Sequence, residues 1–146
     1  MLTIAREVLG RSFEHLRRCG AGREECVVVW AGPLERPGYV DEVIVPRHSA
    51  SAAHYDIDPA WIGELWLDLA ERGVTLRCQV HTHPGPAYHS SRDDNLALIH
   101  TAGYCSLVLP RFAAGPISLA GGYLTVRGES GGWQPLDPAT AIEIER

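Results

Sequence analysis

Two histidines separated by a single residue, His81 and His83, are the residues of this sequence best suited to metal chemistry. They lie at the carboxyl end of residues 74–82, whose alternating pattern predicts a β-strand. Side chains on a strand alternate between its two faces, so both imidazoles project from the same face. Two imidazoles at one strand end can bind one metal ion, and imidazole suits Zn²⁺. The spacing therefore predicts a metal site at this strand end.

A catalytic zinc site needs a third protein ligand and one coordination position open to water. Asp94 can supply that ligand, because it falls in the first turn of a helix expected after the loop 84–90. Water on zinc has its pKa lowered towards about 7, and a nearby carboxylate can then take its proton. Glu24 and Glu25, at the opening of an upstream apolar run, are the expected source of that carboxylate.

Each of these features has an ordinary structural explanation when it is taken alone. A His-x-His pair at a strand end is more often part of the surface or the core than a metal site. Ser91 and Asp94 fit the Ser-x-x-acid pattern that starts a helix, although Glu or Gln is the usual fourth residue. Glu24 and Glu25 fit two solvated charges ahead of a strand. Only their combination favours a catalytic centre.

That combination resembles the JAB/MPN metalloproteases, also called JAMM peptidases. Their motif is an upstream Glu, then His-(Ser/Thr)-His-Pro, and later a Ser followed three residues on by an Asp. Here the chain has His81-Thr82-His83-Pro84, and Ser91 and Asp94 follow the seven residues 84–90. The family's Glu-x-Cys spacing places Glu24 in the catalytic position, with Glu25 as the rival. The resemblance covers roughly residues 24–110.

The resemblance implies a role for each residue of the motif. His81, His83 and Asp94 bind one Zn²⁺, and Glu24 carries a proton from water to the leaving amine. The Ser91 hydroxyl donates a hydrogen bond to the oxyanion of the tetrahedral intermediate. His89 is not expected to be a ligand, because a fourth protein ligand would fill the position of the water. Contact with substrate is its alternative role.

The resemblance also implies a substrate class, namely the C-terminus of a ubiquitin-like modifier, either deconjugated or trimmed from a precursor. Bacterial relatives occur beside E1-like and E2-like proteins, including in antiphage conjugation systems, so such proteins are the expected partners. Three alternatives remain: a peptidase for a sulfur-carrier protein, a phage-tail or cell-wall peptidase, and a non-catalytic MPN scaffold. The complete ligand set argues against the scaffold, and the absence of a signal sequence argues against the cell-wall enzyme.

The elements that must position these residues can be predicted from periodicity and from turn residues. Strands interleaved with helices predict one α/β or α+β domain, residues 1–146, with a mixed β-sheet flanked by helices. Residues 47–57 are expected to form a loop. The expected helices are 3–18, 58–72, 92–102 and a short one from 137, and the expected strands are 24–32, 39–45, 74–82, 106–109, 117–119 and 121–127.

Composition limits the classes of protein to which the chain can belong. The 146 residues carry a net charge of −5, which leaves no excess of basic side chains for nucleic acid. The sequence has neither an apolar run of about 18 residues nor the pattern of a signal peptide, which predicts a soluble cytoplasmic protein. The four cysteines form no Cys-x-x-Cys pair, and we expect free, mostly buried thiols.

Overall fold

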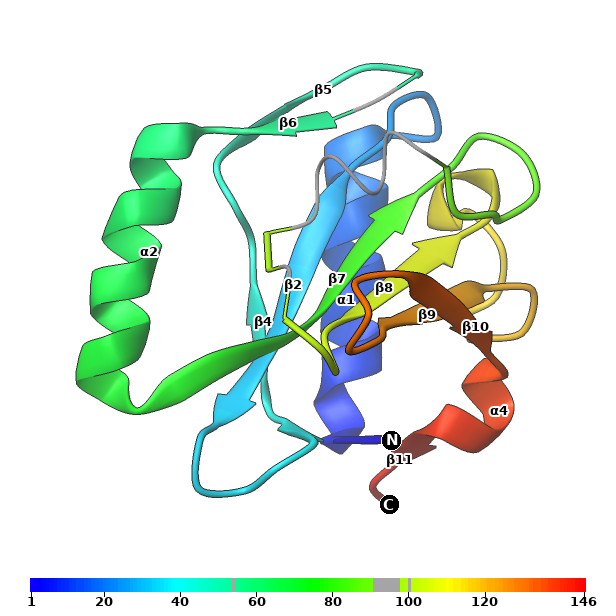
Figure 1. Cartoon of the computed structure of the whole chain (residues 1–146). Helices are drawn as coiled ribbons and strands as arrows, with labels where there is room; N and C mark the ends of the chain where they lie inside the picture. Colours follow the sequence, from blue (N-terminus) through cyan, green and yellow to red (C-terminus); the bar gives the residue numbers. More distant parts are fainter. Residues whose placement is uncertain (54, 91–97, 100) are drawn as a thin grey trace.

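A six-stranded mixed β-sheet organises the computed structural model, which describes residues 1–53, 55–90, 98–99 and 101–146 (Figure 1). The strands lie in the order β10-β9-β8-β7-β2-β4, and β7 and β8 are parallel whereas the other neighbours are antiparallel. This arrangement confirms the predicted fold class. Its strands are β2 (Val27–Pro33), β4 (Glu42–Ile44), β7 (Val74–Thr82), β8 (Cys105–Leu109), β9 (Tyr123–Arg127) and β10 (Trp133–Leu136).

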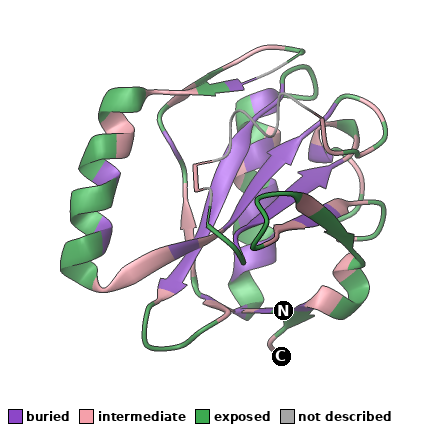
Figure 2. Ribbon diagram, in the orientation of Figure 1, coloured by how far each residue is buried: buried purple, intermediate pink, exposed green. Residues whose placement is uncertain are grey.

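Helix α1 (Arg6–Gly20) covers one face of this sheet, as Figure 1 shows. Its apolar side chains recur at helical spacing, so they form one stripe that packs against the strands. The Trp30 indole nitrogen donates a hydrogen bond of 2.8 Å to the Ser12 hydroxyl, which satisfies two buried polar groups in this core. The strands between the helices are the most buried part of the chain (Figure 2).

Helix α2 (Pro59–Arg72) packs on the opposite face, where Leu65 and Leu69 join a smaller core. Asp58 begins the helix as its N-cap, since its carboxylate accepts a hydrogen bond of 3.0 Å from the Ala60 amide. Gly73 ends it in a left-handed conformation with φ of 64°. The predicted helix is therefore confirmed together with both end signals. Among the described residues, no helix combines the length and apolar character needed to cross a membrane.

Short elements surround the main sheet. A parallel three-stranded sheet joins the two ends of the chain, and a two-stranded hairpin follows β4. The hairpin lies within residues 47–57, which were expected to form a loop. The polar composition of this segment did not indicate strands. These elements are β1 (Leu2–Ile4), β3 (Tyr39–Val40), β5 (His48–Ala50), β6 (Tyr55–Ile57), the 3₁₀ turn η1 (Arg111–Ala113), α4 (Pro138–Ala141) and β11 (Ile142–Ile144).

The C-terminal hairpin differs from its prediction in where it turns. Strand β9 pairs with β10 rather than with residues 117–119. The turn lies at residues 128–132, where the Gly128 amide donates to the Gly132 carbonyl at 2.8 Å and Gly131 has a φ of 89°. Most of the predicted helix 92–102 lies outside the described residues.

The cysteines differ in part from the expectation of free thiols. Cys19 and Cys26 form a disulfide that joins the end of α1 to the residue before β2. Cys78 and Cys105 are free and buried, which confirms the expectation for these two. The disulfide was missed because the two residues belong to different elements, and only the packing of α1 on the sheet brings them together.

Candidate active site

The pairing of β2 with β7 decides which glutamate faces the histidines. Val27 lies opposite His81 in this antiparallel ladder. The pairing continues past the end of the strands, because the Thr82 amide donates to the Cys26 carbonyl at 3.1 Å. The Cys26 amide in turn donates to the Thr82 hydroxyl at 3.0 Å. One residue further along, Glu25 faces His83, with 3.8 Å between its carboxylate Oε1 and the imidazole Nε2.

The two imidazoles lie together within the protein. His81 is 1% exposed and His83 is 4% exposed. Their ring centroids are 5.2 Å apart, and the ring planes are tilted by 56°. The structure thus brings together the two side chains that the sequence placed on one face. The Glu25 carboxylate lies beside the second of these rings.

The backbone around His83 is fixed by the turn that follows β8. The His83 amide donates to the Leu109 carbonyl at 2.9 Å, and the His83 carbonyl accepts from the Phe112 amide, also at 2.9 Å. The Arg111 amide donates to the Gly85 carbonyl at 3.1 Å. These hydrogen bonds hold the main chain at and just beyond His83 against η1. The backbone that carries the His83 ring is therefore fixed in position.

A buried polar layer supports His81. The Tyr55 ring lies 5.3 Å from the His81 ring between centroids, and Gln79 donates a hydrogen bond to the Tyr55 hydroxyl. The Gln79 side-chain oxygen accepts from the Tyr104 hydroxyl at 3.2 Å. Burial raises the pKa of the Tyr104 hydroxyl, which keeps its proton available for this bond. Sequence reasoning missed this layer, although Gln79 is two residues before His81 and so shares its face.

Glu24 and Glu25 have opposite environments. Glu25 is 7% exposed and its amide donates to the Ser51 carbonyl at 2.7 Å, so hairpin β5–β6 helps to position it. Glu24 is exposed, and its neighbour Glu25 takes the place beside the histidines. The prediction that Glu24 faces them does not match this geometry. The Glu-x-Cys spacing pointed to the first glutamate, whereas the strand register selects the second.

The other predicted site residues fall in two groups. Asp94 and Ser91 lie outside the described residues. The His89 ring packs on Trp133, with centroids 4.9 Å apart, and its Nδ1 lies 3.4 Å from the Thr125 hydroxyl. The structure therefore places His89 against strands β9 and β10.

The side chains present fit a divalent metal. Two buried imidazoles from one strand end are ligands that zinc takes in catalytic sites, and the Glu25 carboxylate beside His83 can act as a base there. Tyr88 packs edge-on against the His83 ring at 4.6 Å between centroids and is itself exposed, which marks the side where this centre meets solvent. The arrangement can bind a Lewis acid and place a base beside it.

This fold with this centre defines a JAB/MPN-type domain. Residues 6–119 match the family of prokaryotic homologs of the JAB domain, and the chain belongs to that family. A relative from Sinorhizobium fredii, the probable metalloprotease y4jG, is 33% identical over 124 residues, which cover 82% of this chain and 76% of the relative. These similarities support a metallopeptidase-type function.

Two solved structures share the fold. The solution structure of protein DSY2949 from Desulfitobacterium hafniense matches with a TM-score of 0.70 at 19% identity, covering 99% of this chain and 93% of that one. The crystal structure of AF2198, a JAB1/MPN domain protein from Archaeoglobus fulgidus, matches with a TM-score of 0.56 at 16% identity, covering 99% and 97%. At these identities the likeness concerns the fold.

Proposed function

We propose that the protein is a zinc-dependent peptidase that hydrolyses an amide bond at the C-terminus of a ubiquitin-like modifier. The observation that carries the proposal is the buried Glu25 carboxylate, 3.8 Å from His83, whose ring lies 5.2 Å from the ring of His81 between centroids. A buried acidic group next to one of two paired imidazoles suits proton transfer beside a metal ion. The family membership and the metalloprotease relative support the same chemistry.

In this proposal His81 and His83 hold the zinc, and Asp94, outside the described residues, is the third ligand. When bound, zinc supplies a Lewis acid that lowers the pKa of water and polarises the scissile carbonyl. Glu25 takes the proton from the attacking water and passes it to the leaving amine nitrogen. Ser91, also outside the described residues, is proposed to donate to the oxyanion.

The family resemblance and the surroundings of Glu25 support the proposed substrate class. A modifier's tail must lie extended to reach a buried centre, and extended peptides bind by adding a strand to a sheet edge. Hairpin β5–β6, which is a two-stranded sheet, contacts Glu25 through Ser51 and offers such an edge. We propose deconjugation or precursor trimming, together with E1-like and E2-like proteins of an antiphage system.

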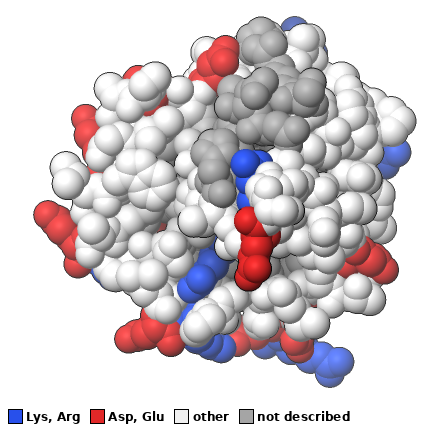
Figure 3. Space-filling view, viewed as in Figure 1, with Lys and Arg blue, Asp and Glu red and all other residues white. Residues whose placement is uncertain are grey.

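The surface charge favours a protein substrate over nucleic acid. On the face shown in Figure 3, the basic side chains among the described residues are dispersed between acidic ones rather than gathered in one patch. The net charge of −5 agrees with this view. Nucleic-acid binding depends on concentrated positive charge, which this face does not supply.

The test uses the full chain and a β-grasp protein ending in Gly-Gly that carries either a C-terminal peptide or an isopeptide-linked lysine. We expect cleavage directly after the Gly-Gly, its loss on metal chelation, and its recovery when zinc is added back. Mass spectrometry of the products locates the cut. Cleavage that survives both chelation and His81→Ala would overturn the proposal. Cleavage of a sulfur-carrier precursor alone would overturn the deconjugating role.

A further inference from the structure

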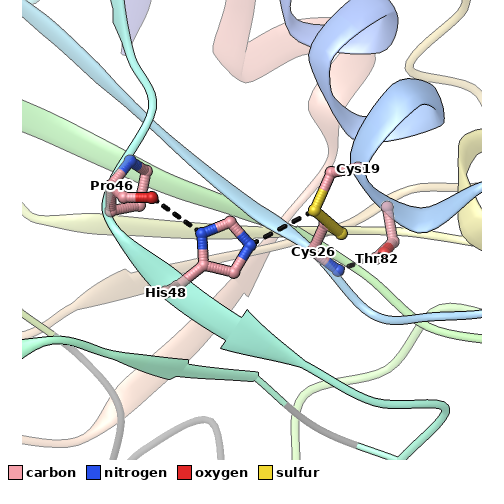
Figure 4. Close-up of a disulfide and its surroundings, with 5 residues drawn as sticks. All are labelled: Cys19, Cys26, Pro46, His48 and Thr82. Atoms are coloured by element: carbon pink, nitrogen blue, oxygen red, sulfur yellow. Dashed lines mark hydrogen bonds between the residues drawn. A yellow bond between two sulfur atoms is a disulfide. The ribbon is translucent and has the colours of Figure 1, made fainter.

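The Cys19–Cys26 disulfide lies beside a histidine, as Figure 4 shows. Cys19 is exposed at the end of α1, and Cys26 is buried next to β2. The His48 Nε2 atom, from β5, is 3.3 Å from the Cys19 sulfur. The two sulfur atoms and a ring nitrogen of His48 all lie within 4.8 Å of one another. Helix α1, the residue before β2 and strand β5 thus bring three metal-binding side chains together.

The hydrogen bond on the far side of the His48 ring sets its tautomer. The Nδ1 atom is 2.8 Å from the Pro46 carbonyl oxygen. A carbonyl oxygen only accepts, so Nδ1 donates this bond, and in the neutral ring the lone pair of Nε2 faces the sulfur atoms. Metal-binding histidines typically donate their other ring N–H to a carbonyl or carboxylate in this manner. The ring is therefore oriented with the nitrogen that can be a ligand towards the two sulfur atoms.

We propose that Cys19, Cys26 and His48 form a second zinc site when the disulfide is reduced. A dithiol reductant gives two electrons and two protons to the disulfide, becomes a disulfide itself, and leaves two protein thiols. Binding of Zn²⁺ by these thiols then releases two protons and forms two Zn–S bonds and one Zn–N bond. The Cα atoms of the cysteines are 6.2 Å apart, which lets both sulfurs reach one ion at about 2.3 Å.

This site is separate from the one proposed to be catalytic. Cys26 and Glu25 are adjacent, so their side chains project to opposite faces of the strand. Cys26 packs in the core under α1, whereas Glu25 faces His83. Cys19 is exposed, so solvent can complete the fourth position of the ion. The thiolate ligands make the site chemically distinct from the histidine centre, which has none.

The experiment uses cobalt(II) as a probe, because thiolate ligands give it a charge-transfer absorption that histidine and carboxylate ligands do not. The full chain is reduced with a phosphine, freed of the reductant without oxygen and titrated with cobalt. We expect this absorption to rise in the reduced protein to a plateau that corresponds to one thiolate-bound ion per chain, while an ion at the histidine centre adds nothing to it. We expect none in the oxidised protein. The His81→Ala variant should give the same plateau, which separates this site from the first.

Three variants decide between the outcomes, with folding checked by circular dichroism. Cys19→Ser should abolish the absorption, and its position at an exposed helix end makes it the safest change. His48→Ala should weaken cobalt affinity at least about tenfold, whereas the matched control His15→Ala, on α1, should leave affinity unchanged. The proposal fails if the reduced chain shows no such absorption, if Cys19→Ser retains it, or if His48→Ala binds as tightly as the natural chain.

Discussion

Glu25 illustrates how the register of a strand decides the surroundings of a residue just ahead of it. Its carboxylate lies beside His83, whereas the side chain of the preceding residue, Glu24, is exposed. Two carboxylates of the same type, adjacent in the chain, are thus placed in different environments. The sequence could predict that only one of them faces the histidines, since neighbours in a strand alternate. It could not predict which one, because the register of β2 against β7 depends on tertiary packing.

The substitution Glu25→Gln should lower kcat by at least about a hundredfold, since a general base contributes about 10²–10⁴ to the rate. Zinc content should not change, because the amide keeps the shape of the side chain and Glu25 is not proposed as a ligand. Glu24→Gln is the matched control and should keep activity within about twofold. Turnover measured with a cleavable modifier, together with metal analysis, checks both. An active Glu25→Gln variant beside an inactive Glu24→Gln variant would return the role to Glu24.

The buried thiols predict a dependence of stability on pH. Burial raises the pKa of the Cys105 thiol to about 11 and that of the Cys78 thiol well above its ordinary value. The unfolded chain ionises its thiols near pH 8.5, so the folded chain binds more protons above that pH. Stability should therefore be complete below about pH 8.5 and fall between there and about pH 11. Urea unfolding across this range tests the sign, and double replacement by Ser should flatten the curve.

At the scale of the element, α2 shows which local signals can be read without a structure. Asp58, Pro59 and Gly73 mark the two ends of the helix, and the structure confirms each of them. Caps depend on only a few neighbouring residues, so they can be predicted from the sequence. Hairpin β5–β6 carries no comparable end signals, and the small and polar residues of this segment gave no indication of its strands.

Removal of the N-cap should cost α2 a measurable part of its stability. Asp58→Ala removes the acceptor for the Ala60 amide and should lower the free energy of unfolding by about 1 kcal/mol. Glu71→Ala, at an exposed position in the last turn, is the control and should change it by less than about 0.5 kcal/mol. Urea denaturation of the oxidised, metal-free chain compares the two. Equal losses would show that the cap is not the cause.

The disulfide links α1 to β2 and should stabilise the oxidised chain. Its cysteines are 7 residues apart in sequence, and closing a loop of that size is worth about 2 kcal/mol in the chain-entropy estimate. Cys19→Ser should lose this amount under oxidising conditions. Under reducing conditions without metal, the variant and the natural chain should unfold alike. A difference that persists after reduction would point to packing rather than to the crosslink.

At the scale of the whole molecule, the two faces of the sheet differ in what they carry. The face under α1 holds the larger apolar core, and the opposite face holds the histidines, Glu25 and the smaller core under α2. The class of fold could be predicted from the alternation of strands and helices. The proximity of the His81 and His83 side chains could be predicted from their spacing on one strand. The strand order and the supporting layer around Gln79 could not, because they depend on contacts between residues distant in sequence.

Two leucine substitutions should measure how unevenly stability is distributed. Leu16 is 1% exposed in the core under α1, and Leu67 is 71% exposed on α2. Leu16→Ala should lower the free energy of unfolding by about 2–5 kcal/mol, because it leaves a cavity. Leu67→Ala removes the same atoms from the surface and should cost less than about 0.5 kcal/mol. Chemical denaturation followed by circular dichroism compares them, and similar losses would contradict the packing of α1.

The ladder between β2 and β7 has a bulge at Trp30 and Ala31. The parts of β2 before and after this bulge should differ in how well they tolerate an inserted residue. One residue inserted between Cys26 and Trp30 would turn Glu25 under α1 and carry Cys26 towards the histidines. An insertion beyond the bulge would leave both in place, since an irregular point can absorb an extra residue. Natural variation in the length of this strand is therefore expected on the far side of Ala31. The stretch from Glu25 to Val29 should keep its number of residues even where their identities change.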